Sequence, residues 1–590
     1  MKNFLPLIAP SVLSRTNTKS FILSLTICFF FLSLPVFSQS QKIIPLSSEI
    51  YGEMDALYLM RGLASPSTAR PWTVNEAREI LDKIEPDLLN QAESSLYEHI
   101  ASEIQKPLRF NADGAFSFDA RLDLALEAYA HTNTDDFVLS EDWNYGYEER
   151  KPFAKLTLEM NLYSWLYICT DLMYNRNRFN EKDNFRSVKD VKQGIGAETS
   201  LPDYYIFPWQ SWAYSKPFIT NFPATQEEFD FDWPKRADIV FGGQYWNISI
   251  ARDRIQWGRG NSGNFVFDSH RDYDEYFRFS AFSQKFKYEW LNVFYTRPES
   301  AGSYKFFMAH RLEFRIIPSL VLALSENIMC VRDAFNPRYI NPAFIFHNWY
   351  DRDNLNSLAH LELDFVPFNG YRIYTQAAFD QIRAPWENDD EPSAWGVIAG
   401  VEHTRPALKG IMTFSLEFAY TTPLLYRRDL VDFITLSDTK TNYAEHSLAM
   451  DYTGFKYGGD VIVIQFDANY RFPGSTLIYA RLFGMIHGNM NFFASHNKDG
   501  KNTGHANLEI QTPSGNDDEK EQTLGISLGA NYSLPQFVSW NKINVWTNLS
   551  YISKKNKLMI SGTGTGEDIF YHKDGIVQDF QIALGMGISF

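Results

Sequence analysis

Apolar and polar residues alternate along most of the chain from about residue 110 onward. In the closing segment QDFQIALGMGISF, one face carries Phe580, Ile582, Leu584, Met586, Ile588 and Phe590. In DVIVIQFDANYRF, the polar face carries Gln465, Asp467, Asn469 and Arg471. A period of two predicts β-strands. A polar face that recurs on strand after strand is typical of a transmembrane barrel with a polar lumen.

The alternating segments predict an all-β, antiparallel transmembrane barrel of about 18 strands in residues 109–590. The predicted strands are 115–130, 153–163, 165–176, 236–242, 245–256, 276–285, 288–297, 306–316, 319–328, 357–366, 370–382, 395–404, 410–421, 458–472, 476–488, 522–534, 541–553 and 576–590. Their connections alternate between short turns, such as RFPGS, and long loops, such as 177–235. Short periplasmic turns and longer extracellular loops are expected of outer-membrane barrels.

Before the barrel, the apolar period changes to that of an α-helix. Helices are predicted in 48–63, 67–85 and near 87–105, with Thr73 as the N-cap of the second and Glu76 completing a capping box. These segments are too short and too polar to span a membrane. We therefore expect residues 39–108 to form a small periplasmic helical region.

The first 38 residues have the pattern of a secretory signal peptide. Lys2, Arg15 and Lys19 precede the apolar stretch FILSLTICFFFLSLPVFS, and small residues favour cleavage after Ser38. An uncleaved membrane anchor is the alternative. Export places the protein in the cell outer membrane. Two cysteines, Cys169 and Cys330, then remain, which is too few for a disulfide framework.

Composition agrees with a barrel and argues against several partners. Aromatic residues make up 16% of the chain, yet the mean hydropathy is -0.30 and 21% of residues are charged, unlike a bundle of transmembrane helices. The net charge is -16, and such acidity argues against nucleic acid as a partner. On the predicted lumen face, charges such as Arg311, Glu313 and Glu362 fit either an open porin or the polar core of a closed barrel.

Two predicted loops combine aromatic rings with acidic residues. The candidate polysaccharide contacts are Tyr204, Tyr205, Trp209, Trp212, Trp386 and Trp395. A sugar stacks its apolar face on such rings while carboxylates accept hydrogen bonds from its hydroxyl groups. The alternative is that some of these rings belong to the aromatic girdle at the membrane interface.

Signals for catalysis, metal binding or nucleotide binding are weak. Ser269 and His270 are adjacent on a predicted extended chain and so point to opposite faces. His270 with Asp272, Asp274 and Glu275 is a poor set of metal ligands. The segment WGRGNSGN lacks the lysine and the following helix of a phosphate-binding loop. We expect no catalytic residue, metal or cofactor.

Several stretches resemble the Wzi-type capsule assembly proteins of the Gram-negative outer membrane. They are residues 50–85, the block IARDRIQWGRGNSGNFVFD, the block NPRYINPAFIFHNWYDRDN and the strand pair after it. The resemblance implies an eighteen-stranded barrel with a periplasmic helical bundle. The residues carried over are Arg254, Trp257, Gly258, Gly260, Asn341 and Pro342, which would shape the barrel mouth and plug. Ala251 and Arg259 depart from the usual glycine and proline of the first block.

The resemblance also implies a function, namely a non-enzymatic surface lectin that binds and retains capsular or extracellular polysaccharide. The expected partners are this polysaccharide, outer-membrane lipid and, during biogenesis, the outer-membrane assembly machinery, for which the terminal Phe590 resembles a signal. A porin or an oligosaccharide-selective channel is the alternative function.

Overall fold

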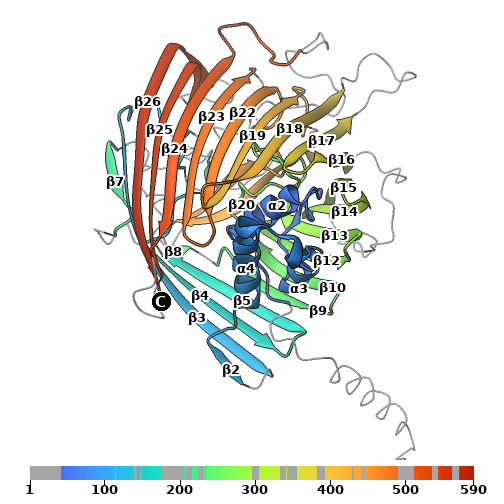
Figure 1. Ribbon diagram of the computed structural model, residues 1–590. Helices are drawn as coiled ribbons and strands as arrows, with labels where there is room; N and C mark the ends of the chain where they lie inside the picture. Colours follow the sequence, from blue (N-terminus) through green and yellow to red (C-terminus); the bar gives the residue numbers. More distant parts are fainter. Residues whose placement is uncertain are drawn as a thin grey trace, which may run out of the picture.

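The structure is a computed structural model in which most of the barrel and the helical region are described (Figure 1). The described residues are 41–112, 115–138, 142–146, 149–174, 205–207, 216–223, 231–232, 234–295, 304–332, 341, 355–381, 393–427, 431–441, 445–489, 511–534, 542–560 and 570–590.

Eighteen antiparallel strands form a closed barrel, which confirms the predicted fold class. The strands are β3 (Phe116–His131), β4 (Ala154–Leu162), β5 (Leu166–Tyr174), β9 (Ala237–Gly242), β10 (Trp246–Asp253), β12 (Asp274–Phe282), β13 (Phe286–Tyr295), β14 (Tyr304–Ile317), β15 (Leu320–Arg332), β16 (Leu355–Phe368), β17 (Tyr371–Gln381), β18 (Ala394–Ala407), β19 (Gly410–Thr421), β22 (Val461–Phe472), β23 (Thr476–His487), β24 (Glu521–Ser533), β25 (Lys542–Ile560) and β26 (Phe570–Ser589). The last strand pairs with the first, in a register that sets Gln581 opposite His131.

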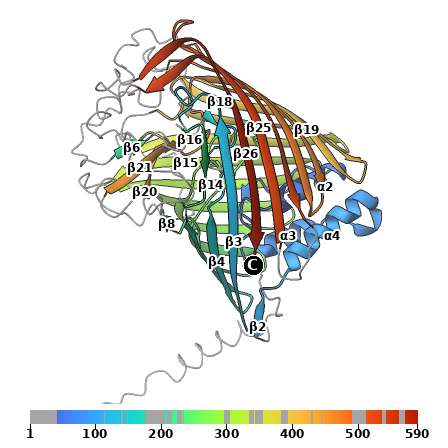
Figure 2. The same ribbon diagram turned by 90° about the vertical axis from the view of Figure 1, so that its left-hand side faces the viewer.

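Six shorter strands accompany the barrel. β2 (Phe110–Ala112) and β7 (Phe218–Thr220) pair with β3, and β8 (Phe231–Asp232) pairs with β5. β6 (Tyr205–Phe207), β20 (Ile434–Thr441) and β21 (Glu445–Tyr452) form a separate sheet. Figure 2 shows this sheet at the end of the barrel away from the helices. We call that end the long-loop end and the other the short-turn end.

The outer face of the barrel wall is apolar and the inner face is more polar, as the alternation predicts. On β26, Phe580, Leu584 and Met586 are 61%, 50% and 57% exposed on the outside of the barrel. Between them, Gln581 and Ala583 are buried on the lumen side. A barrel that crosses hydrocarbon needs this apolar exterior and the closed ring, since no backbone group can remain unpaired there.

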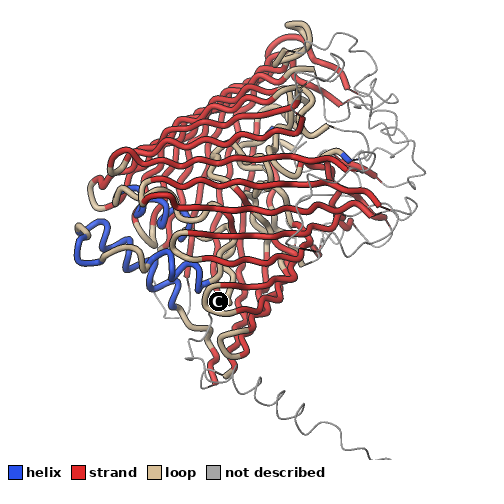
Figure 3. Tube along the Cα trace, turned by 90° about the vertical axis from the view of Figure 1, so that its right-hand side faces the viewer, coloured by secondary structure: helices blue, strands red, loops and turns tan. Residues whose placement is uncertain are grey.

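Three helices lie at the short-turn end (Figure 3). They are α2 (Ile50–Met60), α3 (Val74–Leu81) and α4 (Gln91–Gln105). Leu59 accepts a hydrogen bond from Gly370 in the β16–β17 turn, and His99 lies against Gly474 in the β22–β23 turn. In the described part of the chain, no helix has the length and apolarity required to span a membrane.

The capping box predicted at the second helix is half formed. Thr73 accepts from the backbone N–H of Glu76, but the Glu76 carboxylate forms an ion pair with Lys287 of the barrel wall. The complete capping box belongs to α4, where the Asn90 side chain accepts from Glu93 N and the Glu93 carboxylate accepts from Asn90 N.

The predicted N-cap Thr73 of the second helix is confirmed, but residues 67–72 of the predicted segment are not helical. Residues 64–72 are extended and run into the lumen, and α3 begins at Val74. Pro66 and Pro71 in this stretch explain the difference, because a proline constrains the residue before it away from helical geometry. A second segment, 254–272, enters the lumen from the connection between β10 and β12.

Candidate functional site

The two inserted segments meet inside the barrel and form a plug. β1 (Ala69–Arg70) pairs antiparallel with β11 (Gln256–Trp257), with Ala69 opposite Trp257. Residues 64–72 reach this point from the short-turn end and residues 254–272 from the long-loop end. We refer to these two segments together as the plug.

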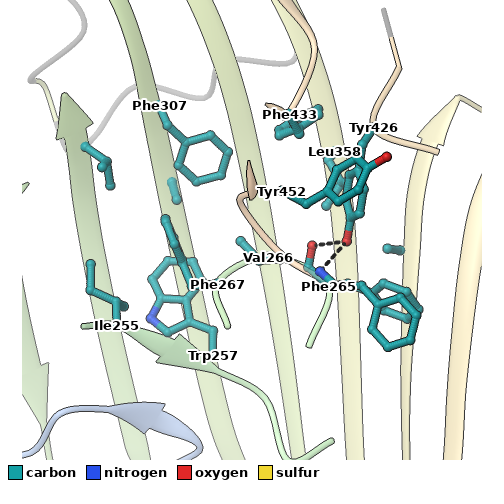
Figure 4. Close-up of a cluster of buried hydrophobic side chains, with 14 of the residues drawn as sticks. Ile255, Trp257, Phe265, Val266, Phe267, Phe307, Leu358, Tyr426, Phe433 and Tyr452 are labelled. Carbon is teal, nitrogen blue, oxygen red and sulfur yellow. Dashed lines mark hydrogen bonds between the residues drawn. The ribbon is translucent and has the colours of Figure 1, made fainter. Parts of the chain in front are cut away.

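An apolar core anchors the plug to one side of the wall (Figure 4). Trp257, Phe265 and Phe267 are fully buried, and the ring of Phe267 packs edge-on against Trp257 and Phe307. Tyr426 holds the other end, since its hydroxyl donates to Phe265 O and accepts from Phe455 N. The wall side of this core comes from β10, β12 to β19 and β22.

The glycine-rich stretch does hold an anion, but the anion is a carboxylate of the barrel itself. The backbone N–H groups of Asn261 and Ser262 donate to Glu417 over 2.8 and 2.7 Å. The Tyr374 hydroxyl donates to the same carboxylate over 2.7 Å. Glu417 therefore occupies the place that a bound anion would take in a phosphate-binding loop.

Hydrogen bonds to an ion-paired cluster of the wall fix the first plug segment. Arg311 pairs with Glu313 and Glu362, and these two carboxylates accept hydrogen bonds from Ser67 and Thr68. All five side chains are buried. Charges buried in this way are stable only when paired and hydrogen-bonded, so this lumen face acts as a polar core.

A third set of charges joins α2 to the second plug segment. Asp55 of α2 pairs with Arg70 and Arg259, and Arg259 also pairs with Glu402 of the wall. Burial alone would raise the pKa of Asp55, but the adjacent Arg259 and Arg70 lower it to about 2. The same carboxylates raise the pKa of Arg259 against the effect of burial. Both groups are therefore ionised at neutral pH.

His270 lies between two carboxylates at the long-loop end of the plug. Its Nδ1 contacts Asp268 at 3.0 Å and its Nε2 contacts Asp451 at 2.9 Å. Burial lowers its pKa, but Asp451 and Asp268 raise it to about 10. Both ring nitrogens are thus occupied, and the arrangement is a structural clamp between the plug and β21 and gives Ser269 no base.

A further part of the chain, residues 142–146 and 149–152, also enters the lumen, on the side away from the apolar core. We call it the inner strap. The carboxylate of Glu127, on β3, accepts from Tyr145 OH, Lys151 N and Trp546 Nε1. Asp142 pairs with Lys554 and Lys557 of β25. These contacts hold the strap against the inner face of β3 and β25.

Between the strap and the plug lies a cavity of about 170 Å³, which we call the outer cavity. Its lining includes Trp143, Glu149, Lys456, Tyr457, Arg481 and Phe483. The rings of Tyr457 and Phe483 are 5.5 Å apart. Arg481 donates through Nε to Asp467, and its side chain is 43% exposed. Aromatic surface beside a few convergent polar groups is typical of small-ligand sites.

The structure places the residues of the first sequence block in the interior of the barrel. Trp257 is buried and donates through Nε1 to Glu289 over 2.7 Å, so it offers no surface to a sugar. Gly258 and Gly260 belong to the loop around Glu417 and Asn264. Arg254 borders a second cavity of the lumen. Of the two expected positions, the barrel mouth and the plug, these residues lie in the plug.

Some of the remaining candidate residues lie within the described part of the chain and others do not. Trp395 lies on β18 and stacks on Tyr420 with ring centroids 5.2 Å apart. Along their strands, both residues lie on the same face as the exposed Val401 and Phe418, which is the outside of the barrel. That position fits the interfacial girdle. Tyr205 begins β6, and Asn341 is exposed. Tyr204, Trp209, Trp212, Trp386 and Pro342 lie outside the described residues.

Comparison with known proteins gives one informative likeness. The sequence matches no protein-family model and no curated protein. Among solved structures, Wzi of Escherichia coli matches with a TM-score of 0.53 and 13% identity, over 93% of this chain and 99% of that one. The chain has the fold of the Wzi barrel. Wzi is an outer membrane protein involved in group 1 capsule assembly and a carbohydrate-binding β-barrel.

Two outer-membrane proteins of other kinds also match, with lower TM-scores. OprD of Pseudomonas aeruginosa gives a TM-score of 0.38 at 6% identity, over 82% of this chain and 98% of that one. The channel DcaP of Acinetobacter baumannii gives 0.32 at 8% identity, over 82% of this chain and all of that one.

Sequence reasoning missed the residues that line the outer cavity. Trp143 and Glu149 lie in a loop that the alternating pattern skips, and Tyr457 lies just before a strand. Arg481 was visible only as a polar residue on a lumen face. The one available signal was the run WNYGYEER, which combines three aromatic residues with charges in eight positions.

Proposed function

We propose that the protein binds an extracellular or capsular polysaccharide at the long-loop end of its barrel and retains it at the cell surface, without cleaving it. The likeness to the whole length of the Wzi barrel, helices included, carries this proposal. Wzi is a carbohydrate-binding protein of capsule assembly, and we extend that role to this chain.

The outer cavity offers chemistry that suits a sugar. One buried water needs a cavity of ~10–15 Å³. The outer cavity, at about 170 Å³, therefore has room for roughly a dozen non-hydrogen atoms, which is about the size of one hexose unit. Tyr457 and Phe483 provide flat apolar surface, and Glu149, Lys456 and Arg481 provide hydrogen-bonding groups. Aromatic side chains with polar neighbours bind amphipathic ligands at low entropic cost.

The proposal includes the location and processing of the chain. We infer that residues 1–38 are a cleaved signal peptide, that residues 39–108 lie in the periplasm and that the barrel of residues 109–590 lies in the outer membrane. The three helices at the short-turn end support this orientation, since short turns face the periplasm in outer-membrane barrels. The long-loop end then faces the medium, where an exported polysaccharide is found.

The decisive experiment is deletion of the gene, followed by measurement of cell-attached and shed polysaccharide. We expect the shed fraction to rise and total synthesis to stay constant. Re-expression of Tyr457→Ala should restore less retention than Phe472→Ala, which removes a ring from the outside of the barrel. An unchanged partition on deletion would refute retention, and shorter glycan chains in the presence of the protein would indicate hydrolysis instead.

A further inference from the structure

A second, larger cavity lies in the lumen toward the short-turn end. This inner cavity measures about 380 Å³. Pro45, Asn544 and Ser589 line it near the short turns, and Lys235, Arg254 and Asp272 line it deeper in the barrel. Its walls are β3 to β5, β10, β25 and β26, together with the residues just before β9.

The two cavities follow the part of the wall that runs from β22 through β26 to β5, beside the apolar core of the plug. The outer cavity is bounded by residues of β22 to β25, such as Phe483, Gly525 and Ile552. The wall strands that give the apolar core its buried residues lie between β10 and β22, and the partly buried Tyr457, Phe483 and Met485 pack against its edge. The plug is therefore eccentric, and the side from β23 through β26 to β5 is less filled.

The inner strap separates the two cavities and also touches both. Trp143, Asn144 and Gly146 face the outer cavity, and Arg150, Lys151 and Pro152 face the inner one. Glu149 lines both cavities and its side chain is exposed. The cavities therefore adjoin at a single acidic side chain.

We propose that the barrel keeps a narrow polar passage along this side, through which water and small inorganic ions move past the plug. The passage runs from the short-turn end through the inner cavity, past Glu149, and through the outer cavity to the long-loop end. It is a function distinct from polysaccharide binding, because it needs no glycan, although it shares the outer cavity with the proposed sugar site.

The chemistry of the lining decides which solutes fit. Basic and acidic groups occur in pairs along the inner cavity, such as Lys155 with Asp171 at 3.0 Å and Lys235 with Asp272 at 3.1 Å. Paired charges of both signs provide hydrogen-bond partners for hydrated ions without a net field that excludes either sign. The narrow contact at Glu149 excludes sugars and larger metabolites, so the passage differs from a general porin.

The test is ion current through the purified full-length protein in planar lipid bilayers, measured without glycan. Wild-type protein should give discrete current steps. Gly525 lines the outer cavity, and a Cβ built there meets its neighbours at 3.6 Å or more, in ordinary contact. Gly525→Trp should therefore fill the cavity and abolish the steps. Ile526→Trp places the same ring on the outside of the same strand and should leave them unchanged.

A second variant tests the point where the two cavities adjoin, and it is expected to increase the current. Glu149→Ala removes the side chain shared by the two cavities and should enlarge the current steps. Folding of each variant is checked by its heat-dependent migration in gels, so that a misfolded barrel is not mistaken for a closed one. Absence of current steps in folded, inserted wild-type protein overturns the passage, as does a Gly525→Trp variant that conducts like the wild type. Polysaccharide retention is scored separately on cells, so either proposal fails alone.

Discussion

Gly260 shows how closely the plug loop packs against itself. A Cβ at this position would lie 1.8 Å from the carbonyl oxygen of Gly263, a distance that no backbone tolerates. Gly258 has a φ of +125°, which favours glycine. With this path the chain can present two N–H groups to Glu417. The glycines of the loop thus serve an internal contact between plug and wall.

Gly260→Ala should destabilise the folded barrel, because the loop must shift away from Gly263 and loosen its contact with Glu417. Overpacking of this kind costs about 1–3 kcal/mol of the free energy of unfolding. Gly525→Ala is the matched control, since its new Cβ meets only ordinary contacts. The measurement is the urea midpoint in detergent micelles; equal midpoints for the two variants would contradict the packing described here.

At the scale of elements, the helical region is tied to the barrel by its connecting segments more than by helix faces. Residues 64–72 between α2 and α3 carry the contacts to Glu313, Glu362 and Asp364 of the wall. α4 packs on α2 and α3 and is farther from the wall. Its stability therefore depends more on its own capping box.

Asn90→Ala should fray the first turn of α4, because two backbone N–H groups lose their acceptor. The expected loss is about 1 kcal/mol, the usual cost of an N-cap. Hydrogen exchange of the Ala92 and Glu93 amides measures it locally. Ser95→Ala, at an exposed position inside the same helix, should slow exchange or leave it unchanged. Faster exchange in both variants would point to general loosening.

Much of the barrel could be predicted from local pattern, and much of the site could not. The alternation of apolar and polar residues indicated eighteen strands, because each wall residue faces either lipid or lumen. β25 extends to Ile560, seven residues beyond the predicted 553, because KKNKLMI has no such alternation. Ser262 and Glu417 are separated by 155 positions in the sequence. No local sequence pattern indicates which carboxylate binds the N–H groups of a loop at such a separation.

For the whole molecule, the buried charges predict a stability that depends on pH. His270 has a pKa of about 10 in the folded protein, raised by Asp451 and Asp268, and an ordinary value near 6.5 when unfolded. Its contribution to the free energy of unfolding is therefore complete below about pH 6.5 and is lost as the pH rises through 10. Asp55 has a pKa of about 2 in the folded protein. Its contribution to the free energy of unfolding is complete above about pH 4 and is lost as the pH falls through 2.

We expect the thermal midpoint of the wild type to fall between about pH 7 and 10 more steeply than that of His270→Gln. The variant keeps a polar side chain beside Asp268 and Asp451 but has no proton to lose. Midpoints in detergent, followed by gel migration at each pH, provide the comparison. Parallel pH profiles for the two proteins would show that other groups govern the alkaline loss.

The meeting of β1 and β11 has a consequence for how the two sides of the membrane communicate. One strand is continuous with the helices at the short-turn end, and the other with a loop that descends from the long-loop end. Their hydrogen bonds and the buried ion pairs around Arg259 link both into one rigid column. Under the proposed function, we expect a pull by bound polysaccharide on the loop that carries β11 to be transmitted to the helices on the opposite side.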